Sequence, residues 1–274
     1  MPFSMRTRLI IGAASALCLL ACGGPKEAPR IERSVRIDAS AIETVETDLG
    51  YRVTLSEARV MVRDFEFTVS GELHEASLWR SVSEFLVPAA WAHPGHFENG
   101  TVTGALSGPH LLDWLPGGSV ELGTGTFIVG SYEGANFTFA RASLGDGLDA
   151  SDPLLGHTAI FRGVAEKEGR SIEFSFTFDS PEERKLLGLP FEYELEEKTE
   201  APIGIRFAPV DPLEKDTFFD GVDFAELDEN GDGELTLGPD ETETALVAAY
   251  NQLRRTFQTH DHYQVVLIPQ GKSP

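Results

Sequence analysis

Long stretches in which apolar and polar side chains alternate constrain the fold of this chain more than any other feature. In "RVMVRDFEFTV" (59–69), Val60 and Val62 precede Arg63 and Asp64, and the apolar positions then resume one residue out of phase. A β-strand places successive side chains on opposite faces, and a bulge with one extra residue shifts that phase. The pattern therefore predicts a half-buried strand with a bulge at Arg63 and Asp64.

A second stretch, "TAIFRGVAEKEGRSIEFSFTFD" (158–179), predicts a β-hairpin. Its turn is expected in "EKEG" (166–169), and the alternate positions that follow put four apolar residues on one face: Ile172, Phe174, Phe176 and Phe178. Similar strand-type runs occur at 33–42, 51–70, 119–143, 201–210 and 263–269. We therefore expect a mainly β chain of roughly nine to twelve strands, folded as an antiparallel β-sandwich with one or two minor helices.

Two helices are predicted from the signals at their N-termini. In "SPEERKLLG" (180–188), Ser180 stands as the N-cap and Pro181 as the first helical residue. In 240–257, Asp240 stands as the N-cap, Glu243 takes the capping-box position, and apolar residues follow at helical spacing. Both segments are expected to be short additions to the strands.

The first residues of the chain indicate export. Arg6 and Arg8 precede an apolar run of about a dozen residues, which is typical of a secretory signal and too short for a permanent membrane span. The run ends in "LLAC" (19–22), which resembles the lipobox of bacterial lipoproteins, where cleavage leaves a lipid-bearing cysteine, here Cys22. We expect a membrane-anchored lipoprotein of the periplasm or cell surface. Its expected parts are a signal peptide at 1–21, a flexible tether at 22–30 and a single β-sandwich domain at 31–274, with a calcium-loop and helix segment at 217–257.

Charge and cysteine content exclude several classes of function. The formal net charge is −22, and removing residues 1–21, which hold two arginines and no acidic residue, makes it −24. Nucleic-acid binding depends on neutralising phosphates with Lys and Arg, so we expect no nucleic-acid partner. The two cysteines are Cys18, within the signal, and Cys22, at the lipid site, so the mature chain has no disulfide and no thiolate nucleophile.

The acidic stretch "LDENGDGELTLGPDETE" (227–243) begins with the spacing of a calcium-binding loop. Acidic or amide side chains stand at every second position before Gly233, and calcium prefers about six to eight oxygen ligands held by a sharply turning loop. Pro239 occupies the position where a bidentate Glu belongs, so a later residue must close the site. The stretch resembles an EF-hand or dockerin-type loop, and an acidic turn capping a helix is the alternative. The expected ligands are Asp228, Asn230, Asp232, Glu234 through its carbonyl, and Asp240 or Glu241.

Two pairs of histidines suggest a second kind of metal site. His93 and His96 lie in "AAWAHPGHFENG" (89–100), and His260 and His262 lie in "THDHY" (259–263). Imidazole nitrogens are ligands for copper and zinc, so convergence of the two pairs would make a four-nitrogen site. Solvated or packed histidines are the alternative interpretation.

Two segments, "DLGYRVTLSEARVMVRDFEF" (48–67) and "AHPGHFENG" (92–100), are similar to periplasmic copper-binding proteins of the MbnP type. Those proteins are secreted or lipid-anchored β-sandwiches whose copper ligands include histidine, with a modified tryptophan in some relatives. The resemblance implies a copper role for His93 and His96, with Trp91 beside them.

The sequence therefore favours a lipid-anchored, extracytoplasmic protein that binds calcium and, at its histidines, copper or zinc. The alternative is a surface module that binds a protein or glycan partner and uses calcium only to stiffen one loop. The sequence has no motif of nucleophilic catalysis or phosphate binding, so we do not expect an enzyme. The alternative is an enzyme of one kind, a metal-dependent hydrolase.

Overall fold

Strands make up most of the structure. The computed structural model describes residues 29–69, 101–115, 120–181 and 184–269, and within these ranges it has twelve strands and two α-helices. The strands are β1 (Arg30–Asp38), β2 (Val45–Glu46), β3 (Arg52–Val69), β4 (Thr101–Asp113), β5 (Glu121–Ile128), β6 (Gly130–Phe139), β7 (Ala159–Lys167), β8 (Arg170–Phe178), β9 (Lys185–Leu195), β10 (Ile203–Phe207), β11 (Glu234–Leu237) and β12 (Tyr263–Leu267). The helices are α2 (Phe224–Leu227) and α3 (Thr244–Phe257), and a short 3-10 turn, η1, spans Leu144–Asp146. The predicted mainly β fold with minor helices is confirmed.

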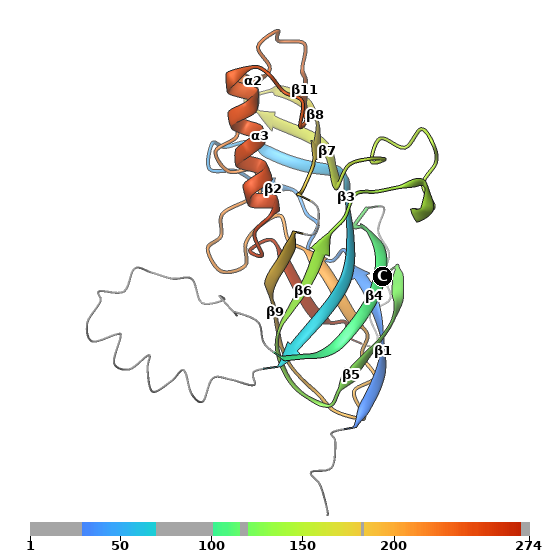
Figure 1. The fold of residues 1–274 in the computed structure, drawn as a ribbon. Helices are drawn as coiled ribbons and strands as arrows, with labels where there is room; N and C mark the ends of the chain where they lie inside the picture. The colour runs from blue at the N-terminus through green and yellow to red at the C-terminus, as the bar shows by residue number, and fades with distance from the viewer. Residues whose placement is uncertain (1–28, 70–100, 116–119, 182–183, 270–274) are drawn as a thin grey trace, which may run out of the picture.

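All twelve strands belong to one sheet. Its main path runs β11-β8-β7-β3-β4-β5-β1-β10-β12, while β2 and β6 also pair with β3, and β9 pairs with β6. The pairing is antiparallel except between β1 and β10 and between β8 and β11. Because β9 also lies beside β12, the part built from β9, β6, β3, β4, β5, β1, β10 and β12 curls round on itself (Figure 1).

The long strand β3 connects two parts of this sheet. Its first half pairs with β7 over residues 52–60, and its second half pairs with β4 and β6 over residues 59–69. Within the second half, Asp64 has a φ of 56° and the register with β4 shifts. The Asp64 carboxylate accepts a hydrogen bond from the Gly108 amide at 2.9 Å, which holds the irregular residue against β4. The predicted bulge is confirmed at this point.

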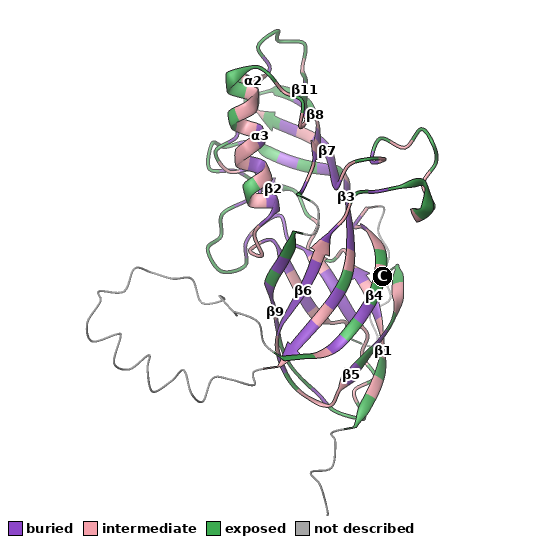
Figure 2. Ribbon diagram, in the orientation of Figure 1, coloured by how far each residue is buried: buried purple, intermediate pink, exposed green. Residues whose placement is uncertain are grey.

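Helix α3 covers one face of the upper part of the sheet in Figure 1. Its buried side chains are Tyr250, Leu253 and Phe257. The Phe257 ring lies 5.3 Å from that of Phe178 on β8 and 4.7 Å from that of Phe139 on β6, so it contacts both parts of the sheet. Offset and tilted aromatic pairs at these separations are favourable beyond the area they bury. The buried residues form a nearly continuous core under these strands (Figure 2).

The predicted hairpin of β7 and β8 is confirmed. Lys167 pairs with Arg170, and the two residues between them, Glu168 and Gly169, have φ values of 51° and 83°. Two positive φ values are typical of a type I′ turn, whose twist matches that of paired strands. The four residues expected on one face of β8 are all buried.

The predicted helix at 180–188 is wrong, because residues from Lys185 onwards belong to β9. β9 pairs with β6 and buries Leu186 and Leu189, and the Gly188 amide donates to Asn136 Oδ1 at 3.0 Å. Partners distant in sequence therefore override the local capping signal of Ser180, which was the basis of the prediction.

The second predicted helix exists but begins later than expected. α3 starts at Thr244 with Glu243 as its N-cap, so Asp240 is not the cap, and Glu243 makes no side-chain capping bond. Within the residues that the structure describes, no helix combines the length and apolar character needed to cross a membrane.

Several predicted features lie outside the described residues. These are the signal peptide, Cys22 and most of the tether, together with Trp91, His93 and His96. The described chain begins at Pro29, whose carbonyl accepts the Val129 amide at 2.9 Å, and Arg30, expected in the tether, opens β1.

Candidate functional site

The acidic loop lies between α2 and α3, and both of its ends are fixed. At its entrance, the Asp223 carboxylate caps α2 by accepting from the Ala225 and Glu226 amides, each at 3.2 Å. The same carboxylate accepts the Tyr51 hydroxyl at 2.6 Å, which ties α2 to the residue preceding β3. Beyond the acidic positions, β11 pairs in parallel with β8, with Leu235 opposite Phe174. The loop is therefore held by capping on one side and by the sheet on the other.

Asp228, the first expected ligand, has a fully buried side chain. Its Oδ2 accepts the Gly233 amide at 3.0 Å and an Arg170 guanidinium N–H at 2.7 Å. Its Oδ1 is buried and has no hydrogen-bond partner among the described residues. A buried carboxylate oxygen without a partner is costly, so this atom is a natural position for a cation ligand.

The ionisation state of Asp228 suits such a role. Burial opposes its ionisation, but the hydrogen bond and charge of Arg170 and the Gly233 amide outweigh that effect, so the pKa of Asp228 lies below its ordinary value. Asp228 is therefore a carboxylate at neutral pH. Arg170 also brings a positive charge next to it, which lowers the attraction for a second cation.

The next two expected ligands shape the loop. The Asp232 amide donates to Asn230 Oδ1 at 3.0 Å, and the Glu234 amide donates to Asp232 Oδ1 at 2.9 Å. Gly233 has a φ of 84°, which a residue with a side chain adopts only with strain, so glycine at this position permits the sharp turn. Asn230 and Asp232 are exposed, and the Asn230 side-chain amide donates to Asp232 Oδ2 at 2.8 Å, so a cation must displace this bond to reach that oxygen.

The residues expected to close the calcium site, Asp240 and Glu241, lie apart from the first ligands. Glu241 Oε1 accepts the Gly238 amide at 3.2 Å, and Asp240 is exposed. Asp228, Asp232 and Glu241 do not form a set with carboxylate oxygens all within 4.8 Å of one another, so closure by Glu241 requires the exit to move. The structure thus holds Asp228, Asn230 and Asp232 on one turn and leaves the later residues apart from them.

Glu229 and Glu243, which the sequence did not indicate as a pair, lie close together beside this exit. The hydrogen bond that protonated Glu243 donates to Glu229, together with repulsion between the two charges, raises the pKa of Glu243, with a smaller contribution from Glu241. Like charges so close favour a bound cation or a shared proton. The sequence signal was the density of acids in 227–243, but their approach depends on where α3 begins.

The second histidine pair does not lie on a strand, because both residues precede β12. His260 Nε2 lies 3.4 Å from an Asp261 carboxylate oxygen. His262 is 1% exposed, packs against the rings of Phe207 and Phe218, and its Nδ1 donates to the Ala208 carbonyl at 3.0 Å. Burial lowers the pKa of His262, so this imidazole is neutral at pH 7.

Sequence reasoning also missed a group of three acidic residues. Asp211, Glu214 and Asp216 have carboxylate oxygens that all lie within 4.8 Å of one another, and they are the one such group among the described residues. Its sequence signal is the spacing of three acids within "DPLEKD" (211–216), which has meaning only once the segment is known to be a tight turn.

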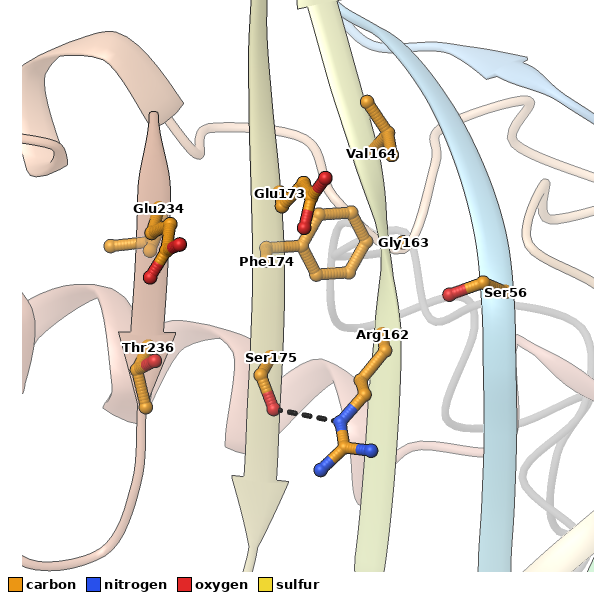
Figure 3. Close-up of a pocket in the computed structure, with 10 residues that line it drawn as sticks. Ser56, Arg162, Gly163, Val164, Glu173, Phe174, Ser175, Glu234 and Thr236 are labelled. Atoms are coloured by element: carbon orange, nitrogen blue, oxygen red, sulfur yellow. Dashed lines mark hydrogen bonds between the residues drawn. The ribbon is translucent and has the colours of Figure 1, made fainter. Parts of the chain in front are cut away.

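A polar hollow of about 450 Å³ lies on the face of the sheet formed by β3, β7, β8 and β11 (Figure 3). Arg162 donates to the Ser175 hydroxyl at 3.1 Å on one side of it, and Glu173 and Glu234 line another side. Since Glu234 belongs to the acidic loop, the hollow and the loop share β11.

Comparison with known proteins does not assign the chain to a family. No family model, no curated protein sequence and no solved structure matches the chain. The resemblances to bacterial lipoproteins, to calcium loops of the EF-hand or dockerin type and to MbnP-type copper-binding proteins therefore stay predictions.

Proposed function

We propose that this chain is a lipid-anchored, extracytoplasmic cation-binding protein whose acidic loop takes calcium. The observation that supports this most directly is the buried Oδ1 of Asp228, which has no partner among the described residues and whose companion oxygen is held by the Gly233 amide. Asn230 and Asp232 supply further oxygen donors on the same turn, together with the Glu234 carbonyl. Calcium is the cation that best matches a flexible set of oxygen ligands.

The expected affinity is low. The Arg170 charge adjoins the first ligand, and Asp240 or Glu241 must shift to complete the coordination. Both effects cost binding free energy, so we expect a dissociation constant at the upper end of the range for calcium loops, about 10⁻⁴–10⁻³ M. An extracytoplasmic site with this affinity would be a structural one.

Thermal unfolding of the full-length protein tests the calcium proposal. A ligand that binds only the folded state raises the Tm, so about 10 mM calcium should raise it by several degrees over a chelator control. Asp228→Asn keeps the size of the side chain but removes its charge, and it should abolish most of the shift. Glu192→Gln, at an exposed position on β9, is the matched control and should keep the shift. A wild-type protein whose Tm does not respond to calcium contradicts the proposal.

The proposed anchor rests on the N-terminal sequence. Cys22→Ser should move the protein from the detergent phase to the aqueous phase in a phase-partition experiment on cells, because the lipid would no longer be attached. Wild-type protein recovered from the cytosol with residues 1–21 intact would contradict the export proposal.

The polar hollow on β3, β7, β8 and β11 favours a second candidate function. It adjoins the loop through Glu234 and could bind a protein or glycan partner while calcium only stiffens β11. We propose binding, not catalysis, in either case. Metal analysis of untagged protein tests the predicted histidine site: stoichiometric copper or zinc that is lost in His93→Ala/His96→Ala favours it, whereas calcium alone is the result expected of both candidates.

A further inference from the structure

Strand β11 lies at one end of the sheet, and within the described residues it pairs only with β8. The pairing is parallel, and the Glu173 amide donates to the Gly233 carbonyl at 2.8 Å. In a parallel pair, alternate residues of one strand bond to the neighbouring strand, and the residues between them direct their amides and carbonyls away from it. Since Gly233 and Leu235 bond to β8, the backbones of Glu234 and Thr236 face the open edge.

Side chains accept the outward amides on either side of Thr236. Asp232 Oδ1 accepts the Glu234 amide at 2.9 Å, and Glu241 Oε1 accepts the Gly238 amide at 3.2 Å. The Thr236 amide, between them, has no side-chain acceptor in the part of the chain that the structure describes. An open amide and carbonyl on an edge strand can pair with an extended chain from another molecule, so Thr236 is a position at which a strand can be added.

The side chains beside this edge carry negative charge. Glu234 lies directly opposite Glu173 in the register of β11 and β8, and both exposed side chains line the polar hollow of Figure 3. Neither carboxylate has an ion-pair partner among the described residues, because the guanidinium of the hollow, Arg162, pairs with Glu57 at 3.0 Å and donates to the Ser175 hydroxyl. Like charges directly opposite each other are destabilising, so this face favours a cationic ligand.

We infer that the hollow and the open edge of β11 form a docking site for an extended segment of another protein that is rich in lysine or arginine. This inference rests on the second candidate function, a binding module, and names its partner. The segment adds to β11 as a strand: its backbone pairs with Thr236, and its basic side chains, which recur on one face at every second position, lie over Glu173 and Glu234. A second copy of this chain is a poor occupant, because each copy has a formal net charge of −22.

Nitrogen-15 NMR titration of the full-length protein, in buffer with a calcium chelator, tests this inference. The probe is a blocked peptide of about eight residues in which lysine alternates with valine, and it should shift the amide resonance of Thr236. One control peptide has glutamate in place of lysine, and another carries methyl groups on its lysine backbone amides. Each should bind at least about tenfold more weakly, because the first loses the charge and the second loses the hydrogen-bond donors.

Variants of the protein separate the edge from the charge. Thr236→Pro removes the outward amide and should abolish binding, since an edge strand tolerates proline where the N–H faces solvent, whereas Thr236→Ala should bind as the wild type does. Glu173→Gln/Glu234→Gln should weaken binding at least about tenfold and stands as the test if Thr236→Pro does not fold. Glu192→Gln/Glu194→Gln removes the same charge from exposed positions of β9 and should leave binding unchanged.

The inference is overturned if the methylated peptide binds as well as its parent, because the attraction would then depend on charge alone. It is also overturned if Glu173→Gln/Glu234→Gln binds the peptide unchanged, or if the Thr236 resonance responds to a neutral oligosaccharide such as maltohexaose and not to the peptide. Calcium is tested separately by thermal unfolding. A calcium response without peptide binding overturns this inference alone, and peptide binding without a calcium response supports it while contradicting the calcium loop.

Discussion

The hydroxyl of Tyr51 links the sheet to the helix that enters the acidic loop, and its removal is a sensitive test of that link. It donates to the Asp223 carboxylate at 2.6 Å and accepts the Ala225 amide at 2.9 Å, while the tyrosine itself is 2% exposed. Tyr51→Phe keeps the ring and removes both hydrogen bonds. Asp223 keeps its two weaker amide bonds, at 3.2 Å.

The expected cost of Tyr51→Phe follows from these contacts. A hydrogen bond to a charged group contributes about 1.5–3 kcal/mol, and the partial exposure of Asp223 reduces that figure. We therefore expect a loss of about 1–2 kcal/mol at neutral pH, which for a chain of this size lowers the Tm by roughly 3–6 °C.

The cost should also depend on pH. The Tyr51 hydrogen bond is the main cause that holds the pKa of Asp223 below its ordinary value of 3.8, more than offsetting burial. A carboxyl group whose folded pKa is depressed contributes stability above its unfolded pKa, and that stability is lost as the pH falls through the folded pKa. The destabilisation by Tyr51→Phe should therefore be full at about pH 5 and above, and should shrink towards about pH 3.

Urea unfolding of wild type and variant at about pH 7, 5 and 3 measures this difference. Tyr132→Phe is the matched control, because the Tyr132 hydroxyl is also buried but bonds only to backbone groups of Ile128 and Thr103. Its cost should not change with pH. The reasoning fails if the two variants have the same pH profile, or if Tyr51→Phe costs less than about 0.5 kcal/mol at neutral pH.

Two other substitutions test the loop and the core. Arg170→Gln removes the positive charge next to Asp228, so calcium should bind about tenfold more tightly in isothermal titration; equal or weaker binding would contradict the loop geometry. Phe257→Ala should cost about 3–5 kcal/mol of unfolding free energy and lower the Tm by roughly 8–15 °C, because the Phe257 ring packs against Phe178 and contacts both parts of the sheet. Arg255 is exposed, so the control Arg255→Ala should change the Tm by no more than about a degree or two.

Features set by neighbours in sequence could be predicted well. The phase slip at Arg63 and Asp64 marks a real bulge, and the alternation after Gly169 defines the buried face of β8. In both cases the side-chain period depends only on the local backbone. The helix predicted at 180–188 failed because its sequence suits a helix start, while the residues from Lys185 onwards gain more by pairing with β6, which is distant along the chain.

In the candidate sites, too, the sequence predicts features that depend on neighbouring residues but not contacts between distant segments. The alternate spacing of Asp228, Asn230 and Asp232 is local, and the turn that it predicts is present. Arg170 lies 58 residues before Asp228, so nothing in the loop sequence reveals their ion pair. His262 was selected with His260 as a pair, whereas its ring packs against Phe207 and its Nδ1 donates to the Ala208 carbonyl, contacts that the pairing of β10 with β12 brings about.

The shared strand β3 has a consequence for how this protein can be divided. Because one half of the strand completes the α3-covered portion and the other half completes the curled portion, neither portion is a separable module. A chain divided midway along β3 would separate residues 52–59 from β7, their partner strand, and would leave unpaired backbone on both fragments. Any shortened version intended for experiments must keep residues 52–69 intact.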